Sequence, residues 1–212
     1  MAIHPMRFHT ADGLWLEGRI CVPDRTRGAA ILCHPYPLMQ GSMSSILIPV
    51  LQRALDAAGW ASLRFNFRGV GRSEGRFERG IGETKDALAA LDLVVAETRP
   101  ERLAVIGWSF GAMVGLRAAA TDARVTDYVA VAPPVTVSSI EYEGPAPEHL
   151  ERWRARAFGI CGTDDRFCDP ADMRAWLGSV SPAANTHVVD GADHFFTGHR
   201  DELTTAVAEF LA

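Results

Sequence analysis

The chain has 212 residues, of which 48% are hydrophobic, so it can bury a full core, and we expect a single domain over residues 1–212. Its formal net charge of −5 would repel a phosphate backbone or an anionic membrane surface, and we expect neither nucleic acid nor a membrane as a partner. The sequence has no apolar run of about 18 residues and no signal-peptide pattern at its amino end, which favours a cytoplasmic location. Its four cysteines include no C-x-x-C pair, so we expect neither a metal site nor a disulfide.

The amino-terminal part of the chain predicts a β-hairpin. Strand-like patterns at residues 6–10 and 14–22 flank Asp12 and Gly13, and Asp-Gly is a typical turn signal between antiparallel strands. After the hairpin, short apolar runs alternate with longer segments of helical period. This alternation indicates an α/β fold with a mostly parallel central sheet and helices on both faces. The expected strands of this part lie at residues 29–33, 61–65, 103–106, 128–132, 157–161 and 186–189.

Three apolar stripes of helical spacing accompany these strands. One stripe covers residues 47–58 and ends at Gly59, and Pro49 must lie in its first turn or kink the helix. The other two cover residues 87–95 and 203–210. The chain shows no internal repeat and no low-complexity tract.

Residues 107–111 read Gly-Trp-Ser-Phe-Gly and lie between an apolar strand and an alanine-rich helical pattern. This is the setting of a nucleophile elbow, in which a serine occupies a strained strand-to-helix turn and the glycines leave room for neighbouring elements. Amide hydrogens at the start of the helix would face negative charge that develops on a substrate oxygen. Ser109 is therefore the candidate nucleophile, although the pattern also fits a helix N-cap between packing glycines.

A serine nucleophile needs a base that takes its proton, and His194 is the candidate. It follows the last expected strand, lies in a turn and precedes a helical pattern. His187 falls inside that strand, and His199 is expected to open the final helix. The alternative interpretation of His194 is an ordinary histidine of a surface turn.

The candidate acid follows the expected strand at residues 157–161, because open α/β sheets build their sites at the carboxyl ends of strands. Asp164 and Asp165 both lie there, but adjacent residues cannot both point at one imidazole. We favour Asp165 and expect Asp164 to bond its own loop. Asp169, which we expect to cap the next helix, and Asp193 are more distant alternatives.

The loop after the first parallel strand is expected to supply one amide of an oxyanion hole. Proline has no amide hydrogen, so Pro35 and Pro37 cannot donate, and Tyr36 remains as the partner of the Phe110 amide. We interpret His34 as a hydrogen-bonding residue that braces this loop.

Residues 68–75 look like a nucleotide-binding loop but do not complete one. The G-x-G-x-x-G pattern requires glycine at the position of Glu74, and the chain contains no G-K-S or G-K-T. We therefore expect no nucleotide cofactor. The glycines of this loop allow a tight crossing near the site, with Arg68 holding the loop by hydrogen bonds.

Taken in order, these motifs resemble the α/β-hydrolase superfamily over nearly the whole chain. The chain is similar in particular to small bacterial hydrolases that carry a His-Pro-x-Pro-Leu segment, an Arg-Phe-Asn-Phe-Arg-Gly-Val-Gly-x-Ser loop and a serine elbow. Here these motifs occupy residues 34–38, 64–73 and 107–111.

The resemblance implies a catalytic triad at Ser109, Asp165 and His194, in agreement with the assignment from strand order. It also implies a dienelactone-hydrolase-like core with a minimal cap. Residues 133–156, rich in proline and charge, are too short for a second domain but could form a small lid. Pro35 departs from the glycine that many members have at this position, so the oxyanion hole is expected to differ in shape.

These residues predict a serine hydrolase that transfers an acyl group from a small-molecule ester, thioester or lactone to water through an acyl-enzyme. No metal or organic cofactor is required. Met39, Trp108 and Phe195, together with Tyr36, are expected to line the pocket, although aromatic residues beside a sheet more often belong to the core. The alternatives are a catalytically inactive binding protein with the same fold and a lyase or perhydrolase that uses the same triad.

Overall fold

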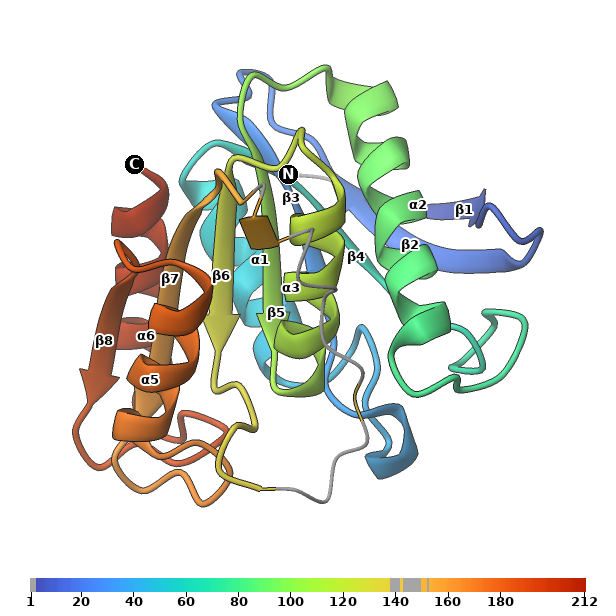
Figure 1. Cartoon of the computed structure of the whole chain (residues 1–212). Helices are drawn as coiled ribbons and strands as arrows, with labels where there is room; N and C mark the ends of the chain where they lie inside the picture. Colours follow the sequence, from blue (N-terminus) through green and yellow to red (C-terminus); the bar gives the residue numbers. More distant parts are fainter. Residues whose placement is uncertain (1–2, 138–141, 143–149, 152) are drawn as a thin grey trace.

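The structure is a computed structural model that describes residues 3–137, 142, 150, 151 and 153–212 (Figure 1). Half of the predicted lid at residues 133–156 lies outside the described residues, so the lid stays a prediction. The described residues form a sheet with helices packed on it, and the loops at the lower edge of Figure 1 follow the carboxyl ends of the parallel strands.

Within the described residues, eight strands form one sheet in the order β1-β2-β4-β3-β5-β6-β7-β8. Neighbouring strands from β4 to β8 are parallel, whereas β2 pairs antiparallel with both β1 and β4. The predicted mostly parallel sheet with an amino-terminal antiparallel hairpin is therefore confirmed. The strands are β1 (Ile3–His9), β2 (Trp15–Cys21), β3 (Gly28–Cys33), β4 (Trp60–Phe65), β5 (Leu103–Trp108), β6 (Asp127–Val131), β7 (Arg156–Gly162) and β8 (Asn185–Val189).

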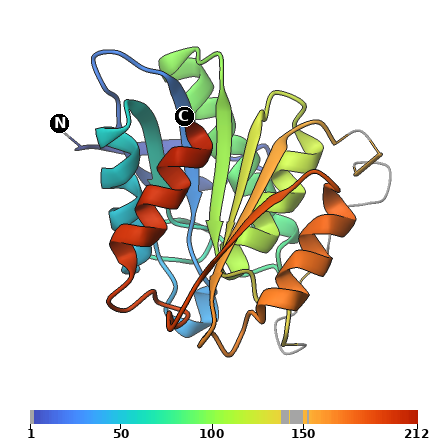
Figure 2. The same ribbon diagram turned by 90° about the vertical axis from the view of Figure 1, so that its left-hand side faces the viewer.

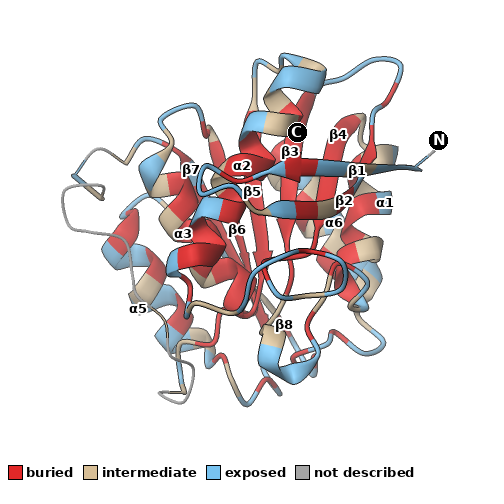
Figure 3. Ribbon diagram, turned by 90° about the vertical axis from the view of Figure 1, so that its right-hand side faces the viewer, coloured by how far each residue is buried: buried red, intermediate tan, exposed pale blue. Residues whose placement is uncertain are grey.

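The strands at the centre of the sheet are more completely buried than the strands at its hairpin edge. Every residue of β3, β4 and β5 is buried, as the red strands in Figure 3 show. Strands covered on both faces need continuous apolar runs, which is the pattern that the sequence shows there. In β2, by contrast, Leu16 and Ile20 are buried while Trp15 and Arg19 are exposed, so this strand covers a core on one face.

Helices cover both faces of the sheet, as predicted. The helices α1 (Leu47–Ala57) and α6 (Arg200–Leu211) pack on one face (Figure 2). The opposite face carries α2 (Ile81–Thr98), α3 (Phe110–Thr121) and α5 (Pro170–Val180). Pro49 lies in the first turn of α1, where an amide hydrogen would have no acceptor within the helix. The proline therefore costs no helical hydrogen bond there. Among the described helices, none is both long and apolar enough to cross a bilayer.

The start of α2 differs from the sequence prediction. The apolar stripe begins at residue 87, but the helix begins at Ile81. The buried carboxylate of Glu83 accepts hydrogen bonds from the amides of Gly80 (2.7 Å) and Glu78 (2.8 Å) and thereby fixes the first turn. This turn buries polar side chains, so hydrophobic periodicity could not locate it.

Candidate active site

Ser109 lies at the sharp turn between β5 and α3. Its backbone has φ 57° and ψ −124°, an uncommon conformation for a residue with a side chain. A Cβ on Gly107 would collide with the backbone of Gly111, and a Cβ on Gly111 would collide with the carbonyl group of Cys33. Positions 107 and 111 therefore require glycine, because neighbouring backbone atoms leave no room for a Cβ atom. The turn has the geometry of the predicted elbow.

His194 and Asp165 lie side by side on the loops that follow β8 and β7. The Nδ1 atom of His194 is 2.8 Å from Oδ2 and 3.0 Å from Oδ1 of Asp165. Both residues are buried, with 9% of His194 and 7% of Asp165 exposed. An ionised carboxylate beside Nδ1 keeps the proton on that nitrogen, so Nε2 carries the lone pair that can act as a base.

The other aspartates that the sequence offered do not contact the imidazole. Asp164 is exposed, and its amide donates to the carbonyl oxygen of Ala192 (3.0 Å). Asp169 caps α5 by accepting the amide of Ala171 (2.7 Å), the capping role that the sequence predicted for it. Asp193 accepts the amides at positions 195 and 197 within its own turn. Among the described residues, Asp165 is thus the acid that bonds His194.

Neighbouring groups hold this pair in place. The indole Nε1 of Trp108 donates to the carbonyl oxygen of His194 (3.1 Å), which ties the histidine loop to the end of β5. The amide of Phe167 donates to Oδ1 of Asp165 (2.8 Å), and the Phe167 ring lies 4.8 Å from the imidazole. Sequence reasoning missed Phe167, although its position two residues after Asp165 was a usable signal.

Ser109 and His194 both line a pocket of about 240 Å³. Larger surface cavities, of about 630, 590, 390 and 270 Å³, lie elsewhere among the described residues, and neither Ser109 nor His194 lines them. The four side chains predicted as pocket residues all line this pocket, and two of them are exposed, Met39 by 72% and Phe195 by 49%. The described residues that line it are Pro35, Tyr36, Met39, Gly41, Ser45, Ile46, Trp108, Ser109, Phe167, His194 and Phe195.

Tyr36 and Phe110, the predicted amide donors, are neighbours across the pocket wall. Tyr36 precedes the short helix η1 (Pro37–Met39) and Phe110 is the first residue of α3. Their rings meet edge to face with centroids 5.3 Å apart. A first helical residue has no intrahelical acceptor for its amide, so the Phe110 amide can serve a substrate oxygen.

His34 braces the loop that carries Tyr36. The residue is fully buried, its Nε2 accepts the amide of Phe67 (3.1 Å), and its Nδ1 therefore donates to the carbonyl oxygen of Pro35 (2.7 Å). Burial lowers the pKa of His34 from 6.5 to about 4, so the ring is neutral near pH 7. This is the bracing role that the sequence suggested.

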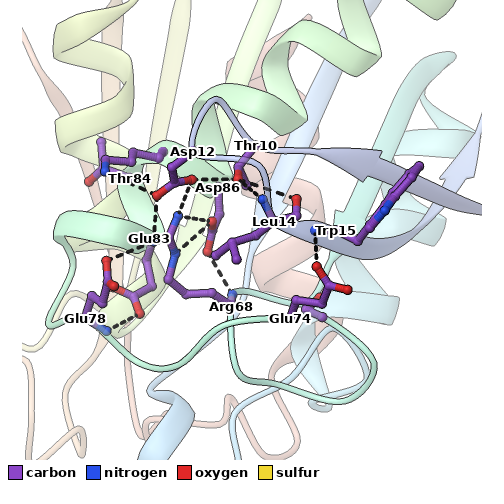
Figure 4. Close-up of polar contacts among 12 residues, drawn as sticks. Thr10, Asp12, Leu14, Trp15, Arg68, Glu74, Glu78, Glu83, Thr84 and Asp86 are labelled. Carbon is purple, nitrogen blue, oxygen red and sulfur yellow. Dashed lines mark hydrogen bonds and ion pairs between the residues drawn. The ribbon is translucent and has the colours of Figure 1, made fainter.

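The loop that holds Phe67 against His34 is itself anchored by Arg68 (Figure 4). The Arg68 side chain is 1% exposed and pairs with the fully buried carboxylate of Asp86 (2.8 Å). Asp12 (3.1 Å) and Glu78 (2.8 Å) supply further acceptors. Burial outweighs the Arg68 charge and raises the pKa of Asp86 to about 6. The sequence suggested that Arg68 holds the loop, but it gave no sign of these partners, which come from three segments.

Comparisons with known proteins place the chain in a family. A family model described as alpha/beta hydrolase fold matches residues 31–158, a segment that includes Ser109 and ends before Asp165 and His194. A solved structure of an alpha-beta serine hydrolase homologue from Coxiella burnetii is 29% identical and has a TM-score of 0.86, covering 100% of this chain and 99% of that chain.

Two relatives extend the comparison. An uncharacterized protein of Rickettsia prowazekii is 30% identical over 189 residues, which are 86% of this chain and 77% of that protein. A thiohydrolase of Arthrinium phaeospermum is 31% identical over 154 residues, which are 69% of this chain. The match spans only 48% of the thiohydrolase.

Proposed function

Because the chain belongs to the α/β hydrolase fold family, we propose that it is a serine hydrolase that cleaves a carboxylic ester or a related acyl bond. Ser109 is the nucleophile, His194 the general base, and Asp165 the carboxylate that orients the imidazole. The pairing of His194 with Asp165 beside Ser109 in one pocket is the observation that carries this proposal.

The reaction proceeds in two acyl transfers. Nε2 of His194 takes the hydroxyl proton while Ser109 Oγ bonds to the substrate carbonyl carbon, and the Phe110 and Tyr36 amides hold the resulting oxyanion. The imidazolium returns this proton to the leaving oxygen or sulfur as its bond to carbon breaks. Water then attacks the acyl-enzyme by the same route and releases a carboxylic acid and the free Ser109 hydroxyl.

The lining of the pocket favours an uncharged, compact acyl substrate. Apart from Ser45, Ser109 and His194, the described lining side chains are apolar or aromatic, and the described part of the chain contributes no Lys, Arg, Asp or Glu to the lining. Its volume lies below the roughly 300 Å³ at which pockets for drug-sized ligands begin. Short esters, lactones and thioesters fit this description, and the thiohydrolase relative supports including thioesters.

A fluorophosphonate probe and a short activated ester test the proposal together. Ser109→Ala should abolish labelling and lower turnover by about a millionfold, because the nucleophile is lost. Ser179→Ala, which changes an exposed serine on α5, is the matched control and should keep both activities. Labelling that survives Ser109→Ala would refute the assignment. A wild-type protein that neither reacts with the probe nor turns over any ester, thioester or lactone would favour the binding-protein alternative.

A further inference from the structure

A second pocket, of about 630 Å³, lies on the hairpin side of the molecule and shares no lining residue with the candidate active site. Its walls come from β1, from β2 and from the loops at Met43 and Arg72. Figure 3 shows β1 and β2 crossing this side, with α1 nearby. Arginine side chains dominate its polar lining, so the pocket differs chemically from the apolar site beside Ser109.

Strand register places several of these charges on one face of the sheet. Arg7 of β1 lies opposite Glu17 of β2, and Arg19 of β2 lies opposite Arg64 of β4. Residues two apart on a strand share a face, so Glu17 and Arg19 point to the same side, and residues directly opposite share that side too. Like charges directly opposite each other destabilise a sheet unless something compensates them.

Within the described residues, the arginines of the pocket form no ion pair with a carboxylate, although Glu17 lies opposite Arg7 in the strand register. No carboxylate of the described chain forms an ion pair with Arg7, Arg19 or Arg72. The Arg7 guanidinium lies 4.8 Å from the centre of the Trp15 ring. Oε1 of Glu17, the acidic residue of the lining, accepts instead from Asn66 Nδ2 (2.8 Å) and from the backbone amide of Arg72 (2.7 Å).

Arg64 adds a buried positive charge beneath this face. The residue is 8% exposed, and its Nη1 donates to the carbonyl oxygen of Met43 (2.8 Å), whereas its Nε has no partner among the described residues. Burial, followed by the charges of Arg19 and Arg53, lowers the pKa of the Arg64 guanidinium. Arg64 does not line the pocket but lies opposite Arg19, so an anion bound at Arg19 would offset part of the positive charge that these two residues concentrate.

We propose that Arg7, Arg19 and Arg72 form a binding site for a small polyanion that carries two or more phosphate or carboxylate groups. Guanidinium forks bind both groups through paired hydrogen bonds, and three forks around one cavity match several anionic groups rather than one. Met43, which lines the pocket, is held in place by two hydrogen bonds. Its amide donates to Asn66 Oδ1 (2.8 Å), and its carbonyl oxygen accepts from Arg64 Nη1 (2.8 Å). The volume admits a small molecule of this kind.

Isothermal titration of the purified protein with tripolyphosphate and with citrate tests this site. We expect saturable binding of at least one of the two that weakens as sodium chloride is raised, because screening reduces attraction between charges. Binding of tripolyphosphate alone would identify phosphate as the recognised group, and binding of citrate alone would identify carboxylate. Absence of binding for both would overturn the proposal.

Substitutions locate the binding. Arg7→Gln/Arg19→Gln/Arg72→Gln should weaken it by about a thousandfold or more, since each of the three lost contacts to a charged group is worth about tenfold or more. Arg19→Gln alone should weaken it by about tenfold, which keeps the test decisive if the triple variant folds poorly.

A matched control separates the effect of this site on binding from the effect of the net charge. Arg25→Gln/Arg99→Gln/Arg174→Gln alters the net charge equally at three exposed positions that line neither pocket, and it should retain the native affinity. Equal weakening in both triple variants would overturn the proposal. Ser109→Ala should bind the polyanion normally, so failure of the hydrolase assignment would leave this result unaffected.

Discussion

Acidification should weaken the fold through His34, because the native protein resists protonating this buried ring. Its pKa falls from 6.5 to about 4 on burial, so the unfolded chain binds the proton more tightly than the folded chain does. The stability that the neutral ring contributes is therefore complete above about pH 6.5 and is lost as the pH falls towards 4. The change of about 2.5 pKa units corresponds to about 3 kcal/mol in total.

His34→Asn removes this titration, and the comparison with wild type isolates it from the carboxylates that titrate in the same range. Urea unfolding should show the variant to be less stable at about pH 7, where it lacks the imidazole bonds. The difference from wild type should shrink by about 2 kcal/mol between about pH 7 and about pH 5, the part of the titration within that window. A constant difference for His34→Asn would refute this reasoning.

Three further substitutions probe the site and its support. Asp165→Asn should lower kcat by about ten-thousandfold in an ester assay, because it disturbs the imidazole tautomer. The control Asp164→Asn should keep a kcat near that of the wild type. Equal effects of the two substitutions would contradict the assignment of the acid. Tyr36→Pro removes one amide donor, and the φ of −55° at this position is one that proline accepts. Its kcat should be lower than that of Tyr36→Ala by about a hundredfold or more. Equal kinetics of the two variants would exclude the Tyr36 amide as a donor. Arg68→Met leaves the buried carboxylate of Asp86 without its cation and should lower the free energy of unfolding, measured with urea, by about 3 to 5 kcal/mol. The double variant with Asp86→Leu should recover part of this loss.

Hydrophobic pattern and chain order were sufficient for the fold. Continuous apolar runs marked the buried parallel strands, and Asp-Gly marked the hairpin turn, where Gly13 has φ +86°. The same order of motifs predicted that Asp165 and His194 would meet at one edge of the sheet, and their side chains are hydrogen-bonded there. Parallel strands bring their carboxyl ends to one edge, so sequence order carries this information.

Polar contacts between distant segments could not be predicted in the same way. Arg68 binds Asp12, Glu78 and Asp86, and a one-dimensional pattern does not record which carboxylates converge on a buried guanidinium. The start of α2 was missed because its first turn buries polar groups. Pocket residues such as Ile46 come from a loop whose position depends on packing rather than on periodicity.

The bond between the Trp108 indole and the His194 carbonyl oxygen joins positions that are 86 residues apart in the sequence. Since Trp108 directly precedes Ser109, two consecutive residues position both the hydroxyl and the backbone of the imidazole loop. The spacing of these groups is thus tied to the buried middle of the sheet as well as to the peripheral strand β8 and helix α6. Fraying of the carboxyl-terminal helix on warming would then leave this hydrogen bond intact until the middle of the sheet melts.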